Sequence, residues 1–129
     1  MSDDGRLGLT VTHRRYVAQA DARYAGDLVA GAYVLELFGD VVTELSIRSD
    51  SDEGLCAGYD DVQFLAPVHA GDVIEITGTL TRIGRRSRTV ELTAQVVCRA
   101  APERSPSAAD VLPDPVLVTR ARGTLVVPG

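Results

Sequence analysis

The feature that most constrains the fold is a long apolar segment that begins at Leu28 and ends at Ile47. Its apolar residues cover most of the circumference of a helix, so we predict a helix that is buried on nearly all sides. They are Leu28, Val29, Ala32, Tyr33, Leu35, Leu37, Phe38, Val41, Val42 and Leu45. Asp27 is the predicted N-cap, because its carboxylate can accept hydrogen bonds from first-turn amides.

A narrow polar stripe follows the predicted helix. Its members share one face because their spacing is i, i+4, i+7, i+8: Glu36, Asp40, Thr43 and Glu44. No arginine of the predicted helix balances the three carboxylates, although like charges one turn apart are destabilising. The stripe is either a surface that faces solvent or another subunit, or part of an acidic site.

The rest of the chain alternates apolar and polar residues, which is typical of strands. We predict a strand before the helix and four after it, at 7–18, 58–66, 73–83, 89–98 and 116–127. Loops or turns are predicted at 20–26, 48–54, 69–72, 84–87 and 101–115. One helix against an antiparallel sheet is an α+β fold, and 129 residues form a single domain, 1–129.

One sheet of this length does not cover a helix on every side. The predicted strand at 58–66 also offers an edge with which a second subunit can pair. We therefore expect the protein to associate with itself, as a homodimer or a higher oligomer.

Composition excludes several classes of function. The net charge is −5 without a basic run, which argues against nucleic-acid binding. All 13 basic residues are arginine, so no lysine can form a Schiff base. Cys56 and Cys98 have no zinc or redox spacing and are expected to be buried free thiols. No secretory signal or membrane-length apolar run occurs, so a cytoplasmic protein with no membrane partner is expected.

Several short runs, in this order, resemble a known family. They are DARYAGDLVAG before the helix, FLAPVHAGD at 64–72 and IGRRSR at 83–88. Together they resemble hotdog-fold proteins that act on acyl-CoA, in which a sheet wraps one central helix and dimers share a continuous sheet. DARYAGDLVAG, LFGDVVTEL, DEGL and YDDVQFLAPV are similar to one branch, the 3-aminobutyryl-CoA and β-alanyl-CoA ammonia lyases.

One departure separates this chain from another branch of the same family. The resemblance implies that hotdog acyl-CoA thioesterases carry a catalytic Asp or Glu at the place of Phe38. Phenylalanine can neither activate water nor attack a thioester. The resemblance therefore favours a lyase that eliminates or adds ammonia across the Cα–Cβ bond of a short β-aminoacyl-CoA.

The lyase reaction needs a carboxylate to take the proton beside the thioester, and a second acid or a tyrosine to handle the amine. The residue types and the resemblance together suggest five catalytic candidates: Tyr24, Asp27, Glu36, Asp40 and Asp60. Asp60, or Asp61 in its place, would come from a neighbouring subunit. Backbone amides near Leu28, Val29 and Ala30 would stabilise the thioester oxygen. Coenzyme A is part of the substrate, and no cofactor or metal is required.

The turn at 84–87 and the residue after it supply the candidates for binding coenzyme A. Hotdog proteins often meet the phosphates there, and guanidinium groups bind phosphate bidentately. The residues are Arg85, Arg86, Ser87 and Arg88.

Each candidate also has a purely structural interpretation. Asp27 can serve only as a cap, Tyr24 as a loop aromatic folded onto the core, and the arginines as a charged hairpin tip. Three other functions stay open: an acyl-CoA thioesterase, a related hydratase, and a hotdog protein that binds an acyl thioester without turning it over.

Overall fold

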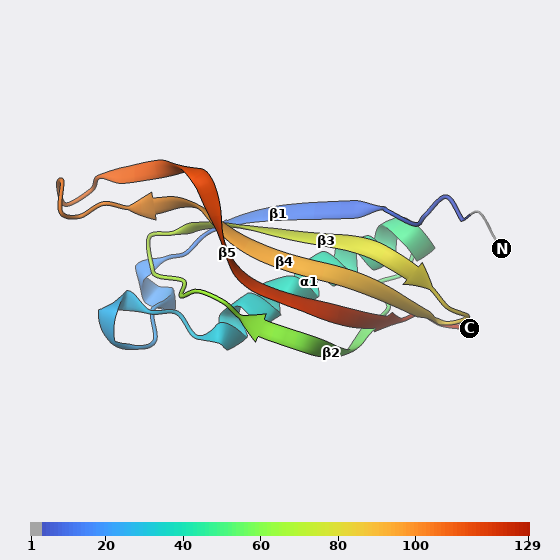
Figure 1. The fold of residues 1–129 in the computed structure, drawn as a ribbon. Helices are drawn as coiled ribbons and strands as arrows, with labels where there is room; N and C mark the ends of the chain where they lie inside the picture. The colour runs from blue at the N-terminus through green and yellow to red at the C-terminus, as the bar shows by residue number, and fades with distance from the viewer. Residues whose placement is uncertain (1–3) are drawn as a thin grey trace.

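The computed structural model describes residues 4–129 and consists of one antiparallel sheet with a long helix across one face (Figure 1). The sheet has five strands in the order β1-β3-β4-β5-β2, so β1 and β2 form its edges. The strands are β1 Thr10–Tyr16, β2 Leu55–Phe64, β3 Val73–Ile83, β4 Ser87–Ala100 and β5 Ala109–Val126. The helix is α1, Gly31–Asp50, and short 3-10 turns lie at Gln19–Asp21 and Ala25–Asp27. The predicted α+β class is confirmed.

The helix begins three residues later than predicted, and Asp27 is not its N-cap. Ala30 caps α1 without a side-chain hydrogen bond, whereas Asp27 lies in a 3-10 turn with a φ of 60°. The reason is that Leu28 and Ala30 are extended, and that Val29 between them donates its amide to the carbonyl of Val68 at 2.9 Å. This cross-chain bond holds the segment before Gly31 out of the helix.

The last strand is longer than predicted. β5 begins at Ala109, inside the stretch predicted as a loop, and pairs with β4 as far as Ala100. Pro113 and Pro115 are tolerated because they lie where the register between the strands shifts and no ladder amide is required. The end of β4 and the beginning of β5 therefore extend past the rest of the sheet as a two-stranded arm (Figure 1).

The core lies between α1 and the sheet. The helix contributes Val34, Phe38, Val41, Val42 and Leu45, and the sheet contributes residues such as Ile74, Ile76, Leu80, Val90 and Leu92. The approach is closest at Gly78, where a Cβ atom would lie 2.7 Å from Cγ1 of Val41. The sheet contacts only one side of the helix, so the prediction of burial on nearly all sides is wrong for the single chain. Glu36, Asp40 and Ile47 are exposed on the outer side.

Ion pairs fix the C-terminal half of the helix. The carboxylate of Glu44 accepts hydrogen bonds from His13 and from Arg48, both at 2.8 Å. The expectation that no arginine balances the polar stripe was wrong because α1 extends beyond Ile47 and includes Arg48. Among the described residues, no helix is long and apolar enough to cross a membrane.

Candidate active site

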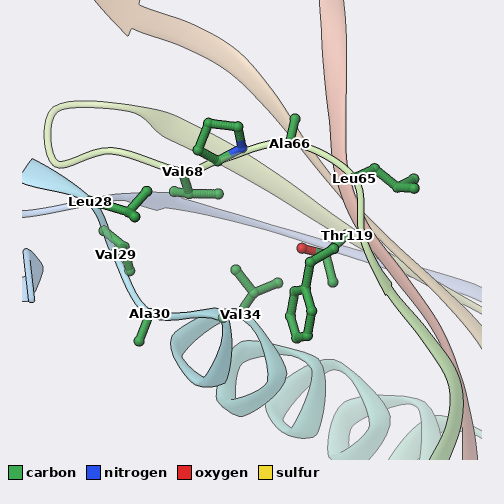
Figure 2. A pocket seen from close by; sticks show the side chains of 11 residues that line it. Leu28, Val29, Ala30, Val34, Leu65, Ala66, Val68 and Thr119 are labelled. Atoms are coloured by element: carbon green, nitrogen blue, oxygen red, sulfur yellow. The ribbon is translucent and has the colours of Figure 1, made fainter. Parts of the chain in front are cut away.

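A cavity of about 450 Å³ opens between the start of α1 and the segment that follows β2 (Figure 2). We refer to it as the helix-start cavity. Its lining is almost entirely apolar, and among the described residues 4–129 that line it only Thr119 has a polar side chain. The lining residues are Leu28, Val29, Ala30, Gly31, Val34, Phe64, Leu65, Ala66, Pro67, Val68 and Thr119.

Backbone hydrogen bonds hold the two walls of this cavity in place. On one wall, Val29 donates to the carbonyl of Val68, and Leu28 forms a bridge with His69. On the other, the amide of Leu65 donates to the carbonyl of Val118 at 2.7 Å, which fixes the end of β2 against β5. Backbone hydrogen bonds therefore hold the two walls apart, and the apolar side chains that line them do not fill the space between.

Gly31 is required where α1 meets this cavity. A Cβ atom at that position would lie 2.6 Å from Cε1 of Phe64, so the absence of a side chain lets the phenyl ring lie against the first turn. The ring of Phe64 thus forms part of the wall while 58% of the residue stays exposed.

The first turn of α1 offers backbone donors to the helix-start cavity. The N-cap residue Ala30 provides no side-chain acceptor, and the amides of Gly31 and Ala32 precede the first intrahelical hydrogen bonds. The amides of Leu28 and Val29 are already bonded, to the carbonyls of Tyr24 and Val68. Leu28 and Val29 line the cavity as expected of binding residues. Of the three amides predicted as donors, that of Ala30 makes no hydrogen bond within residues 4–129, and those of Gly31 and Ala32 follow it.

Two of the predicted catalytic residues lie beside the helix-start cavity without lining it. Tyr24 is an exposed loop residue, and Asp27 lines a neighbouring cavity of about 340 Å³ together with His69, Asp72 and Arg99. Asp72 is buried there and accepts hydrogen bonds from Arg99 at 3.0 Å. The Asp72–Arg99 pair ties the 69–72 turn to β4 and lines the second cavity.

The other predicted carboxylates lie on the outside of the single chain. Glu36 and Asp40 are exposed on the outer side of α1, and Asp60 is exposed on β2, 3.9 Å from Arg122. Burial and the neighbouring Cys56 raise the pKa of Tyr59, and the charge of Asp40 contributes in the same direction. None of these three lines the helix-start cavity of its own chain.

The arginine turn between β3 and β4 divides into exposed and buried members. Arg85, Arg86 and Ser87 are exposed, whereas the side chain of Arg88 is only 6% exposed and pairs with Asp50 at 2.7 Å. Hydrogen bonds from Arg88 hold the pKa of Asp50 below its usual value. Because its guanidinium also donates to the carbonyls of Gly84 and Ser87, Arg88 has a structural role instead of the predicted phosphate contact.

The arginine turn and the helix-start cavity lie at opposite ends of α1 in one chain (Figure 1). The turn lies near the C-terminal end of the helix, where Arg88 contacts Asp50, and the cavity surrounds the N-terminal end. One chain alone therefore does not place both predicted halves of the substrate site together.

Phe38, where the resemblance to thioesterases leads us to expect a catalytic acid in that branch, belongs to the core. It is 0% exposed, and its ring packs edge-to-face against Tyr59 with the centroids 6.4 Å apart. The hydroxyl of Tyr59 donates to the carbonyl of Leu35, which holds this aromatic pair in position. The space that a thioesterase would give to a carboxylate is filled by hydrocarbon.

Sequence reasoning overlooked the cavity wall formed by Phe64, Ala66 and Thr119. A signal for Thr119 was present, because in the predicted last strand it lies on the same side as the inward-facing Ala121 and Leu125. A polar residue at an inward position of a strand is unusual and marks a place to examine.

The sequence of the chain matches one superfamily. The model of the Thioesterase superfamily matches residues 26–96, and the chain belongs to this superfamily of hotdog-fold proteins. Within it, the 3-aminobutyryl-CoA ammonia lyase of Acetoanaerobium sticklandii is 52% identical over 108 residues, which cover 84% of this chain and 86% of the relative.

Solved structures agree with this placement. The β-alanyl-CoA:ammonia lyase from Clostridium propionicum superposes with a TM-score of 0.89 at 35% identity, covering 94% of this chain and 86% of that one. A hexameric hotdog-fold thioesterase of Campylobacter jejuni superposes with a TM-score of 0.74 at 19% identity, covering 91% and 81%. The second match shows the fold alone. The expected hotdog architecture and the resemblance to the ammonia lyases are confirmed.

Proposed function

We infer that this protein is an ammonia lyase that acts on short β-aminoacyl-CoA thioesters of the 3-aminobutyryl-CoA type. The 52% identity to a 3-aminobutyryl-CoA ammonia lyase over most of both chains carries this conclusion. The buried Phe38 at the thioesterase acid position agrees with it, because hydrolysis would lack its carboxylate.

The chemistry is an elimination beside a thioester. A base removes a proton from Cα, the C–H electron pair forms the Cα–Cβ double bond, and the C–N bond breaks with its electrons on nitrogen. Ammonia leaves and takes up the proton as ammonium, and the products are an enoyl-CoA and ammonium. Negative charge develops on the thioester oxygen as the proton departs, so amide donors aimed at that oxygen lower the barrier.

The helix-start cavity suits the acyl end of this substrate. Its apolar walls and volume of about 450 Å³ accommodate a short acyl chain, and the amides of Gly31 and Ala32 carry the positive end of the helix dipole. A dry site of this kind also strengthens the interaction between the amides and the developing oxyanion. The reaction moves protons without changing an oxidation state, so the proposal includes no metal or organic cofactor.

A second copy of the chain completes the site in this proposal. The lining of the helix-start cavity contains no side chain that can take a proton, and Arg85 and Arg86 lie at the other end of α1. A two-fold partner whose helix runs in the opposite direction would bring its arginine turn and its outer carboxylates toward the cavity. We assign the base to Glu36, Asp40 or Asp60 and the phosphate contacts to Arg85, Arg86 and Ser87. We also propose a cytoplasmic location, because coenzyme A thioesters are intracellular metabolites.

The direct test uses purified protein with crotonyl-CoA and ammonium. The enoyl absorbance should disappear while a thiol-reactive dye detects no free coenzyme A. Replacement of ammonium by another salt separates the lyase from a hydratase, because a hydratase needs only water. Free thiol appearing while the enoyl absorbance persists would show a thioesterase and overturn the proposal.

Single substitutions then identify the base. Among Glu36→Gln, Asp40→Asn and Asp60→Asn, the one that removes the base should lower kcat by about 10²- to 10⁴-fold. Glu53→Gln is the matched control, because Glu53 is an exposed carboxylate in the turn after α1 and has no assigned role. Full activity in all three variants would exclude these carboxylates as the base.

A further inference from the structure

The one polar side chain in the lining of the helix-start cavity has no role in the mechanism above. We propose that the hydroxyl of Thr119 accepts a hydrogen bond from the ammonium group on the β carbon of the substrate. Thr119 is then a positioning residue that distinguishes β-aminoacyl thioesters from unsubstituted acyl thioesters. This inference rests on the proposed function and deepens it by naming what selects the substrate.

Thr119 occupies an inward position of β5. It pairs in register with Phe64 of β2 and with Ala94 of β4. Along β5 it follows the same every-second-residue pattern as the buried Ala121 and Leu125. Only 2% of the residue is exposed. The sheet therefore presents Thr119 to the interior, and its neighbours on that side are apolar.

The hydroxyl is directed into the cavity. Figure 2 shows its oxygen facing the space bounded by Val34 and Val68. Within residues 4–129, the hydroxyl makes no hydrogen bond to another side chain or to the backbone. It is not a sealed, unpaired group, because it opens onto the cavity, where solvent or a ligand can reach it. Its hydrogen-bonding capacity is therefore available to a molecule bound in the cavity.

The position of Thr119 matches the polar ends of a β-aminoacyl thioester. The start of α1 forms the helix wall of the cavity and Thr119 lies on the sheet wall, with Val34 between Ala30 and Thr119 in the view of Figure 2. The thioester oxygen and the β nitrogen of the substrate are likewise separated by a short apolar segment. With the oxygen at the amides, the nitrogen meets the sheet wall, where, among the described lining residues, no other side chain can accept a hydrogen bond from it.

A hydroxyl is chemically suited to this role. Its oxygen accepts a hydrogen bond from ammonium, yet it carries no charge that would hold the cation as strongly as a carboxylate does. A strong ion pair would stabilise the bound substrate more than the transition state in which the C–N bond breaks, and would slow the reaction. Thr119 orients the leaving group and releases it.

The test compares binding of two thioesters that differ only in the amino group. Dissociation constants for β-alanyl-CoA and propionyl-CoA are measured by calorimetry for the wild type, Thr119→Val and Thr119→Ser. Thr119→Val should weaken β-alanyl-CoA by about 10- to 100-fold and leave propionyl-CoA unchanged, as expected for loss of a hydrogen bond to a charged group. Thr119→Ser, which keeps the hydroxyl, should retain the wild-type preference.

Matched controls keep the result specific. Thr124→Val removes a hydroxyl from the same strand at a position outside the cavity lining and should change neither constant. Thermal unfolding confirms that each variant is folded, and Thr119→Ala replaces Thr119→Val if the latter is not. An equal loss of both thioesters, or no loss of either, would overturn the inference. A wild type that prefers β-alanyl-CoA in binding but eliminates no ammonia would overturn the proposed function while leaving this inference standing.

Discussion

At the scale of single residues, the site depends on the absence of a side chain at Gly31. A side chain there would meet the ring of Phe64, so the wall of the helix-start cavity and the first turn of α1 are fitted to each other. The backbone conformation of Gly31 is ordinary for a helix, and the requirement is for space. Cavity shape and helix stability therefore make opposite demands on this position.

Gly31→Ala should separate stability from activity. Alanine favours a helix over glycine by up to about 1 kcal/mol, and the exposed ring of Phe64 can rotate away, so the free energy of unfolding should change by no more than this. The displaced ring changes the cavity, and kcat/KM should fall about 10- to 100-fold. Thermal unfolding and steady-state kinetics measure the two effects.

Gly39→Ala serves as the control for Gly31→Ala. Gly39 is another α1 glycine, and its added Cβ would make an ordinary 3.6 Å contact with the hydroxyl of Tyr59. It should keep wild-type kinetics. Full activity in Gly31→Ala would show that Phe64 does not shape the site.

The sequence indicated which kinds of residues lie near the site, but it was less informative about where their side chains point. It identified Leu28 and Val29 as binding residues, and both line the cavity, although their amides are already bonded. It assigned Asp27 a role as N-cap of the long helix, which Ala30 takes instead because Val29 bonds to Val68. It also placed Arg88 on the surface, because a hairpin tip with three arginines is usually solvated. The partner that buries Arg88, Asp50, is 38 residues away in sequence, so no local pattern reveals the pair.

At the scale of secondary-structure elements, the last turn of α1 is joined to the β3–β4 turn by a charged cluster. Asp50 accepts hydrogen bonds from Arg88 and, at 3.0 Å, from Arg6 of the N-terminal segment. The side chain of Asp50 is only 11% exposed, so its charge needs these partners. Three elements distant in sequence thus meet at one carboxylate.

Arg88→Leu should destabilise the fold by about 3 kcal/mol, because it leaves the buried Asp50 carboxylate with Arg6 as its remaining ion-pair partner. Arg85→Leu in the same turn removes an exposed guanidinium and should change stability by less than about 0.5 kcal/mol. Chemical unfolding of both variants provides the comparison. Equal stabilities would show that the Arg88–Asp50 pair does not hold the helix to the sheet.

Element boundaries were predictable where alternation was regular. The strand predicted at 73–83 coincides with β3, Val73–Ile83, because apolar and polar residues alternate there without interruption. β5 was shortened because its first part contains two prolines, which usually mark loops, and only the register shift opposite β4 makes room for them. The end of α1 was missed because RSDSDEG is polar, and contacts of Asp50 and of the buried Ser46 extend the helix three residues into this run, to Asp50.

At the scale of the whole molecule, the two halves of the substrate site are separated in one chain. β2 is an edge strand, and its end carries the exposed Phe64 and Leu65 beside the helix-start cavity. Pairing of β2 with a second copy would cover these residues and bring in the missing polar groups. The self-association expected from the sequence has the same origin, a helix that one sheet covers on one side only.

Gly58→Arg tests whether the β2 edge forms this interface. A Cβ atom at Gly58 meets nothing within 4 Å in the single chain, so the substitution should be tolerated by the fold. At an interface it should shift the protein toward the monomer and lower lyase activity together with the molar mass. Light scattering after size exclusion and the crotonyl-CoA assay measure both.

Gly5→Arg is the control for Gly58→Arg, because a Cβ atom at Gly5 also meets nothing within 4 Å. It should change neither mass nor activity. A Gly58→Arg protein that is monomeric and fully active would refute the completion of the site by a second copy. An unchanged oligomer would place the interface on another surface.

The burial of Phe38 also bears on how activities diverge on this scaffold. Its ring and that of Tyr59 fill the interior beside α1, so an aspartate in its place would be an uncompensated charge among hydrocarbon side chains. A lineage passing between ammonia elimination and thioester hydrolysis must therefore rebuild its interior as well as its reactive groups. A more stable ancestral protein would tolerate the destabilising substitutions that such a change of activity requires.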